Sequence, residues 1–131
     1  GEEGIEMLRQ AIALDPEYME ALYTLISYFD AEERDDELLE LASMAVESGN
    51  DWHALYPMIA RAYDRTEQFD KAFEYYNKAY PAFSDDPEFL ESFALFLVEE
   101  GKRDRALEII KQLQVLEPEN PQWFDWLQSF E

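Results

Sequence analysis

The sequence of 131 residues contains no cysteine, one histidine and four glycines that stand apart from one another. Without cysteine, the chain can form no disulfide, no thiolate zinc site and no thiol nucleophile. The histidine, His53, has no carboxylates near it at a metal-ligand spacing, so we interpret it as an ordinary helix-start residue. No glycine-rich phosphate loop is present. We therefore predict no catalytic site, no metal and no cofactor.

Basic residues are scarce: the chain has ten Lys and Arg and 31 Asp and Glu, which gives a formal net charge of −21 at pH 7. Binding to nucleic acid and to anionic lipid depends on basic side chains, so we expect neither as a partner. An acidic surface attracts cationic segments of other proteins, at a rate that decreases as salt is added. The alternative interpretation is that these charges only keep the protein soluble.

Long apolar runs are also missing. None approaches the ~20 residues that a membrane-spanning helix needs, and the acidic start of the chain differs from the basic head of a signal peptide. Together with the absence of cysteine, this leads us to expect a cytoplasmic protein. Hydrophobic residues make up 47% of the chain, which is enough for a folded domain. The chain does not start with Met, and we expect it to belong to a longer parent protein.

What the sequence does contain is a repeat. Ala11, Ala45, Ala79 and Leu113 stand 34 residues apart, with no insertion or deletion between them. The same register aligns four further apolar sets: Leu25, Ile59 and Phe93; Ile26, Ala60 and Ala94; Phe29, Tyr63 and Leu97; Leu38, Ala72 and Ala106. A period of this length that is kept so strictly predicts stacked helix hairpins.

Apolar residues at three-to-four spacing predict an all-α chain without strands. The expected hairpins join a helix at 16–32 to one that ends at Gly49, then 53–65 to 69–80, and 87–100 to 104–116. The predicted N-caps are Asp15, Asp35 or Asp36, Asp86 and Asn120, three of which precede a proline. Gly101 separates the helices of the third hairpin. Pro57 is expected in a first turn, and Pro81 is expected to close its helix.

These residues resemble the tetratricopeptide repeat family over nearly the whole chain. The best match is residues 53–86, with Tyr56, Ile59, Ala60, Tyr63, Phe69, Ala72, Tyr76 and Ala79 in the family's positions. Residues 19–52 diverge most, because Ile26 and Leu38 occupy places that the family keeps small. The resemblance implies one domain with a right-handed superhelical stack of antiparallel helix hairpins. Its parts would be the second helix of a truncated repeat at 4–14, repeats at 19–52, 53–86 and 87–120, and a C-terminal capping helix at 121–131.

In this family the first helices of the hairpins line a concave groove that binds a peptide or a helix of another protein. Carried over to this sequence, the partner-binding groove contains Glu20, Tyr23, Ser27, Asp30, Pro57, Arg61, Asp64, Glu88, Glu91, Leu95 and Val98. Arg61 is expected to pair with Asp64 or Asp30. Co-chaperone members hold a terminal carboxylate with Lys, Arg and Asn, but here Ser27 and Leu95 replace Asn and Glu91 replaces Lys. We therefore predict a non-catalytic scaffold that binds a basic or amphipathic segment.

The two ends of the chain support an alternative function. Residues 4–14 match only a second helix and have two apolar faces: Ile5, Leu8 and Ile12 on one, and Met7, Ala11 and Leu14 on the other. In the capping helix, Trp123, Leu127 and Phe130 are expected to face inward, and a docking surface is the other interpretation of these aromatics. The second hypothesis is thus a structural spacer of a longer repeat array, or a chain that forms homo-oligomers through its terminal helices.

Overall fold

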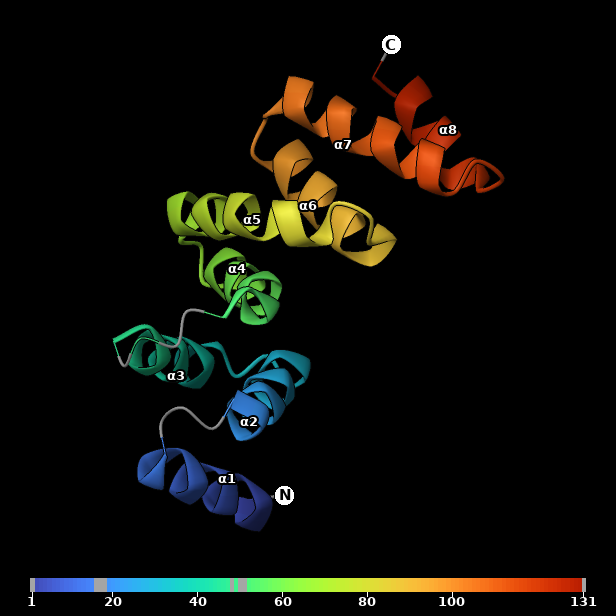
Figure 1. Cartoon of the computed structure of the whole chain (residues 1–131). Helices are drawn as coiled ribbons and strands as arrows, with labels where there is room; N and C mark the ends of the chain where they lie inside the picture. Colours follow the sequence, from blue (N-terminus) through green and yellow to red (C-terminus); the bar gives the residue numbers. More distant parts are fainter. Residues whose placement is uncertain (1, 16–18, 48, 50–51, 131) are drawn as a thin grey trace. The chain divides into compact units, whose positions relative to one another are not determined.

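The computed structural model describes residues 2–15, 19–47, 49 and 52–130, which form eight α-helices, one 3₁₀ turn and no strand. The helices are α1 (Glu2–Leu14), α2 (Met19–Ala31), α3 (Asp35–Glu47), α4 (Tyr56–Arg65), α5 (Phe69–Phe83), α6 (Pro87–Glu99), α7 (Arg103–Leu116) and α8 (Pro121–Gln128), and the 3₁₀ turn, η1 (His53–Leu55), precedes α4 (Figure 1). The all-α fold of helix hairpins that the sequence predicts is confirmed.

The chain divides into two compact units, Gly1–Ala79 and Tyr80–Glu131. In the first unit, each of α1, α2 and α3 packs on the next helix along the chain. The hairpin of α4 and α5 is closed by aromatic rings, because Tyr75 lies 5.5 Å from Tyr56 and 5.6 Å from Tyr63. In the second unit, α6 packs on α7 and α7 on α8. Packing between sequence neighbours is the arrangement that a repeat produces.

The three hairpin turns share one backbone geometry that recurs every 34 residues. In each turn the N–H of the residue before the second helix donates to a carbonyl of the first helix at 2.8 Å: Arg34 to Phe29, Gln68 to Tyr63, and Lys102 to Leu97. The preceding residue has a positive φ, which is 54° at Glu33, 60° at Glu67 and 73° at Gly101. This is the Schellman arrangement, which satisfies the last carbonyls of a helix.

Two of the predicted N-caps are confirmed. The Asp86 carboxylate accepts hydrogen bonds from the N–H groups of Glu88 and Phe89 at 3.0 and 3.5 Å, and the Asn120 side chain accepts one from Gln122 at 2.9 Å. Pro57 lies in the first turn of α4, as expected. The predicted cap at Asp15 serves a helix start at Pro16, which lies outside the described residues.

Three predicted helix ends are wrong. Arg34, rather than Asp35 or Asp36, directly precedes α3, and its carbonyl accepts the first hydrogen bond of the helix from the Leu38 N–H at 3.0 Å. Pro81 lies inside α5, which continues to Phe83, and its missing N–H leaves one bond of the helical ladder unformed. The last helix ends at Gln128 instead of 131, where the Ser129 hydroxyl donates to a backbone carbonyl of the last turn.

Most residues of the 34-residue register lie in the core of the two units, whereas Ala11 and Tyr63 are partly exposed. Those with 0% exposed surface include Leu25, Ile26, Phe29, Leu38, Ala60, Ala72, Ala79, Phe93, Ala94, Leu97, Ala106 and Leu113. Ile26 and Leu38, which are wider than the family's usual residues, are therefore accommodated inside the first unit. Burying such side chains stabilises a fold by roughly 1.5–3 kcal/mol each relative to leaving them exposed.

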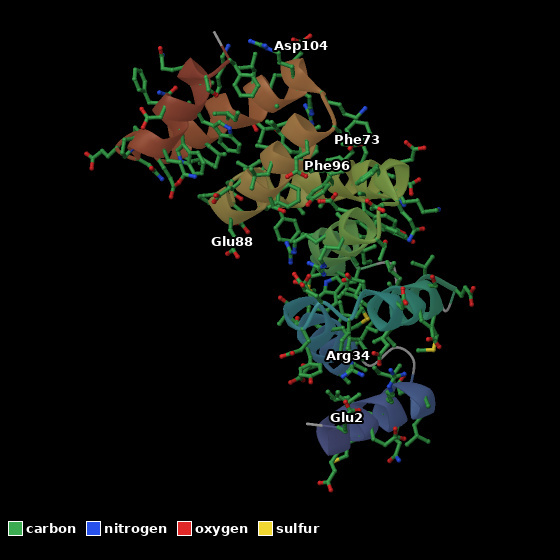
Figure 2. The ribbon with its side chains drawn as sticks, turned by 180° about the vertical axis from the view of Figure 1, so that it is seen from behind. Glu2, Arg34, Phe73, Glu88, Phe96 and Asp104 are labelled. Carbon is green, nitrogen blue, oxygen red and sulfur yellow. The ribbon has the colours of Figure 1, made fainter. Side chains whose placement is uncertain are left out.

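The first helix, α1, has one buried and one exposed apolar face. Ile5 and Ile12 are buried, whereas Met7 is 71% exposed and Leu14 is 88% exposed. An ion pair also connects α1 to the turn before α3: the guanidinium of Arg34 lies 3.1 Å from the carboxylate of Glu2 (Figure 2). The two apolar faces expected from the sequence are thus both present.

Candidate functional site

In the first unit, the predicted groove residues of α2 meet the segment that leads into α4. Tyr23, Ser27 and Asp30 share one face of α2, because they follow one another at spacings of four and three residues. Each contacts a residue on the other side of the interface. The Tyr23 ring lies 5.5 Å from the Trp52 ring, the Ser27 hydroxyl lies 3.5 Å from the Met58 sulfur, and the Asp30 carboxylate lies 2.7 Å from the Arg61 guanidinium. We call the surface made by Glu20, Tyr23, Ser27, Asp30, Trp52 and Arg61 the α2–α4 face.

Asp30 is the centre of an ion-pair network. Its carboxylate lies 2.7 Å from Arg61 and 3.0 Å from Arg65, and Arg65 also lies 2.7 Å from Asp35. Partial burial raises the pKa of Asp30, but the hydrogen bonds and positive charges of the two arginines outweigh it and lower the pKa below its ordinary value. Burial likewise opposes the charge of Arg65, whereas Asp35 and Asp30 raise its pKa overall.

Asp30, one of the two partners expected for Arg61, forms an ion pair with it at 2.7 Å. Two carboxylates and two guanidinium groups balance one another at this end of the α2–α4 face. At this end of the face, the charges of these four groups therefore cancel, although the chain as a whole is strongly acidic. A ligand that competes for Asp30 would first have to displace two arginines.

The remaining predicted residues differ in accessibility. Glu20 is exposed and Asp64 is partly exposed, but Pro57 is buried and does not offer its ring to a ligand. In the second unit, Leu95 is 45% exposed, and the other predicted residues of α6, Glu88, Glu91 and Val98, are exposed or partly exposed. Figure 2 shows Glu88 projecting outward from the start of α6. We call these four residues the α6 face.

Sequence reasoning missed Trp52 and Met58, although both contact predicted groove residues. Trp52 directly precedes the turn η1 and so lies outside the helical spacing from which the groove was built. Met58 follows Pro57, and the sequence predicts Pro57 and not Met58 as a groove residue. The Met58 side chain is only 7% exposed. The sequence signal was an aromatic residue just before a helix, and the tyrosine that it contacts is given by the structure.

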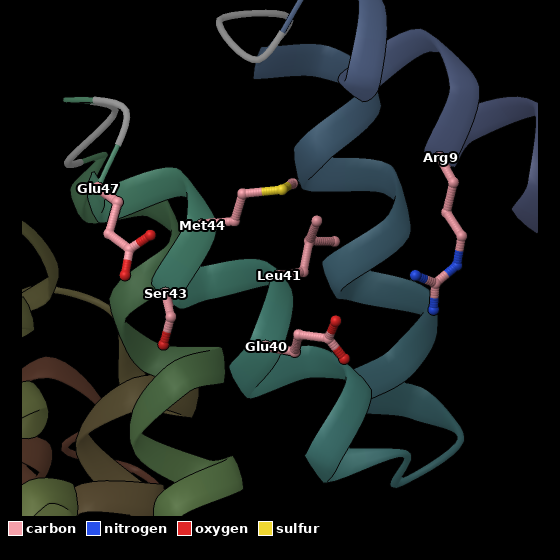
Figure 3. A pocket seen from close by; sticks show the side chains of 6 residues that line it. All are labelled: Arg9, Glu40, Leu41, Ser43, Met44 and Glu47. Carbon is pink, nitrogen blue, oxygen red and sulfur yellow. The ribbon is translucent and has the colours of Figure 1, made fainter.

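Two clefts lie between second helices of hairpins, where the sequence indicated no site. One has a volume of about 390 Å³ and is lined by Arg9 of α1 and by Glu40, Leu41, Ser43, Met44 and Glu47 of α3 (Figure 3). The other, in the second unit, has a volume of about 470 Å³ and is lined by Tyr80, Ser84, Lys111, Gln112, Val115 and Leu116.

No three His, Asp or Glu side chains gather in the described part of the chain in the way that a metal ion would require. In the same part of the chain, no helix is both long and apolar enough to cross a membrane. His53 is exposed and begins the turn η1, as its interpretation as a helix-start residue implies.

Comparison with known proteins identifies relatives of the chain. Residues 54–120 match the family model described as YpiA-like, C-terminal tetratricopeptide repeats. The TPR repeat-containing protein YpiA of Bacillus subtilis (strain 168) is 34% identical over 119 residues, which are 91% of this chain and 28% of that protein. The chain thus spans less than a third of this relative.

Solved structures share the fold at lower sequence identity. YrrB, described as a TPR protein with an unusual peptide-binding site, has a TM-score of 0.80 and 23% identity over 94% of this chain and 63% of its own. MamA has a TM-score of 0.81 and 15% identity over 94% of this chain and 72% of its own. At these identities the likeness concerns the fold alone.

Proposed function

Because this chain belongs to the family of YpiA-like, C-terminal tetratricopeptide repeats, we propose that it is a non-catalytic scaffold whose first-helix faces bind a basic or amphipathic segment of a partner protein. Tetratricopeptide-repeat proteins are in general protein–protein interaction scaffolds, and YrrB, which shares the fold, is described as having a peptide-binding site. The proposal concerns this chain and not the whole length of its relatives.

The observation that carries the proposal is the pairing of exposed apolar side chains with exposed carboxylates on two first helices. On α2, Tyr23 is 43% exposed and lies one turn from the exposed Glu20. On α6, Leu95 is 45% exposed and lies two turns from the exposed Glu88. Neither Glu20 nor Glu88 has an ion-pair partner among the described residues, so both can meet Lys or Arg of a ligand without displacing a group of the chain.

A titration with peptides tests the proposal. Two amphipathic helix-forming peptides with the same leucine positions, one with arginines and one with glutamates on its polar face, are titrated into the protein at low and at high salt. We expect the arginine peptide to bind and its affinity to fall as salt is added, because exposed charge pairs are screened. Preference for the glutamate peptide, or binding that is indifferent to salt, would contradict the proposed ligand.

A pair of matched variants locates the charge effect. The double variant Glu20→Gln with Glu88→Gln removes two carboxylates from the α2–α4 and α6 faces. The control, Glu3→Gln with Glu74→Gln, removes the same charge from exposed positions on α1 and α5. Weaker binding of the arginine peptide by the first variant and not by the second is the expected result. An equal loss in both would mean that net charge, and not these faces, attracts the peptide.

A second candidate function is self-association through the terminal helices. It is favoured by the exposed apolar residues on α1 and α8, where Met7 is 71%, Leu14 88% and Phe124 53% exposed. Light scattering over a dilution series separates the two candidates. Self-association is supported if the protein forms a dimer that dissociates on dilution and that Leu14→Gln abolishes. A monomer at all concentrations would contradict self-association.

A further inference from the structure

The most exposed aromatic pair on the α2–α4 face is formed by Tyr23 and Trp52. Their ring centroids lie 5.5 Å apart at an angle of 54°, and both rings reach solvent, with Tyr23 43% exposed. Among the described residues, no Lys or Arg of the chain lies over either ring. In the described part of the chain, no internal cation therefore competes with a ligand for the exposed surface of these rings.

Elsewhere the chain covers similar aromatic pairs with its own cations. The Lys78 ammonium lies 4.8 Å from the centroid of Tyr75 and 6.0 Å from that of Tyr56, two rings that contact one another. Two further ring pairs are covered in the same way: Tyr28 and Phe29 by Arg34, and Tyr80 and Phe93 by Arg105. A cation within about 6 Å of a ring centroid is attracted by the negative face of the ring.

Two other aromatic pairs are poorer candidates because one ring of each is buried. The Trp123 ring pairs with Trp126 at 5.9 Å, but Trp123 is 2% exposed and its indole N–H donates to Glu117 at 2.8 Å. Phe83 pairs with Phe89 at 5.5 Å, but Phe89 is 3% exposed. A ligand cannot reach the face of a ring that the core already covers.

A carboxylate completes the site at Tyr23. Glu20 lies three residues before Tyr23 on α2, so its side chain is a neighbour of the ring on the same helix face. Glu20 is exposed and holds no cation of the described chain, whereas Asp30 on the same helix is engaged by two arginines. A guanidinium or ammonium group seated on the rings would also gain this negative charge.

We propose that Tyr23, Trp52 and Glu20 form the subsite that binds an Arg or Lys side chain of the partner segment. This inference rests on the proposed function and makes it more specific, because it assigns the ligand's cation to one end of the α2–α4 face. The carboxylate of Asp30 already pairs with two arginines of the chain and is not available to a further cation. The exposed Tyr23 ring can contact the alkyl stem of the ligand's Arg or Lys as well as its charged group.

Citrulline provides a probe, because it replaces the guanidinium of arginine with a neutral group of nearly the same shape. The arginine peptide described above and its citrulline counterpart are titrated into the wild type, Tyr23→Leu and Trp52→Leu. We expect both variants to bind the arginine peptide about three- to thirtyfold more weakly. Their affinity for the citrulline peptide should change far less, because that peptide brings no cation to the rings.

Two controls separate this effect from damage to the fold. Tyr23→Phe keeps the ring and should bind the arginine peptide as the wild type does. Phe124→Leu removes an aromatic ring of similar exposure from α8 and should leave binding unchanged. In nuclear magnetic resonance spectra, the Trp52 indole N–H signal, assigned with Trp52→Phe, should shift on adding the arginine peptide, while the Trp123 signal stays in place.

The results distinguish the subsite from the proposed function. If Tyr23→Leu and Trp52→Leu bind the arginine peptide as tightly as the wild type while Glu20→Gln with Glu88→Gln binds weakly, the aromatic subsite is refuted and the scaffold function stands. Equal losses for the arginine and citrulline peptides also refute it, because the rings then contribute apolar contact alone. If the wild type binds no arginine peptide, both proposals fail.

Discussion

The first and second units repeat the same helical register but hold their helices together with different chemistry. In the first, ion pairs connect neighbouring helices, with Asp30 joined to Arg61 and Arg65 at 2.7 and 3.0 Å. In the second, an ion pair joins Arg105 and Glu108 within one helix, and buried aromatic and aliphatic residues pack between the helices. One hairpin spacing is therefore compatible with either kind of interface, because the register needs only buried apolar residues at its own positions.

This contrast has consequences for how each unit responds to its surroundings. Apolar packing is largely insensitive to pH and salt, whereas ion pairs depend on both. Charged groups that are partly removed from water also cost desolvation energy, which the pairing must offset. We expect mutations to be most harmful in the apolar interface and pH to act mainly on the charged one.

The largest effect is expected at Trp123, which anchors α8 in the second unit. Its side chain is 2% exposed, and its indole N–H donates to Glu117 at 2.8 Å. Trp123→Ala should lower the free energy of unfolding by about 3–5 kcal/mol, because it leaves a cavity and an unpaired carboxylate oxygen. Urea unfolding followed by circular dichroism measures the change. The exposed Phe124→Ala is the control, and equal losses in the two variants would show that Trp123 does not anchor the helix.

The next effect is expected at Asp30, which is 17% exposed at its side chain. Asp30→Asn should lower the free energy of unfolding by about 1–3 kcal/mol, because it leaves two arginines without their shared carboxylate. This range lies between the contributions typical of exposed and of buried ion pairs. The exposed Glu40→Gln on α3 is the matched loss of charge and should cost much less. Unfolding in urea at neutral pH compares the two variants.

The Asp30 effect should also depend on pH in a defined direction. The pKa of Asp30 in the folded protein lies below its ordinary value of 3.8, so the folded state binds its proton less readily than the unfolded state. The stabilisation by Asp30 is therefore complete above pH 3.8 and is lost as the pH falls through the lower folded pKa. The stability difference between wild type and Asp30→Asn should shrink in this window. A constant difference down to acid pH would mean that Asp30 acts by shape and not by charge.

A smaller effect is expected at the hairpin turns. Glu67 has a φ of 60°, a left-handed conformation that favours glycine, and Gly101 holds the equivalent position one repeat later with a φ of 73°. Glu67→Gly should raise the free energy of unfolding by about 1 kcal/mol, and Gly101→Glu should lower it by a similar amount. A Cβ at Gly101 would meet nothing within 4 Å, so any loss there comes from the backbone alone. Changes of the same sign in both variants would contradict this explanation.

The sequence predicted the features that depend on local spacing and missed those that depend on a specific neighbour. The hairpins and the buried face follow from apolar residues at the 34-residue register, and Gly101 was predicted because glycine is the usual residue after a helix. Glu67 carries no such signal, because a glutamate is rarely left-handed. Trp52 was missed because its role comes from the ring of Tyr23, on a helix separated from it in the sequence.

The smallest effect is expected at Glu108, whose side chain is 66% exposed and lies 3.1 Å from Arg105 on the same helix. Arg105 is also held by rings, because its guanidinium lies 4.9 Å from the Tyr80 centroid and 5.7 Å from that of Phe93. Glu108→Gln should therefore change the free energy of unfolding by less than about 0.5 kcal/mol, and Arg105→Ala should cost more because it uncovers the rings. Urea unfolding at low and high salt measures both variants. A loss at Glu108 as large as that at Asp30 would mean that the second unit also depends on ion pairs, and the contrast between the two interfaces would disappear.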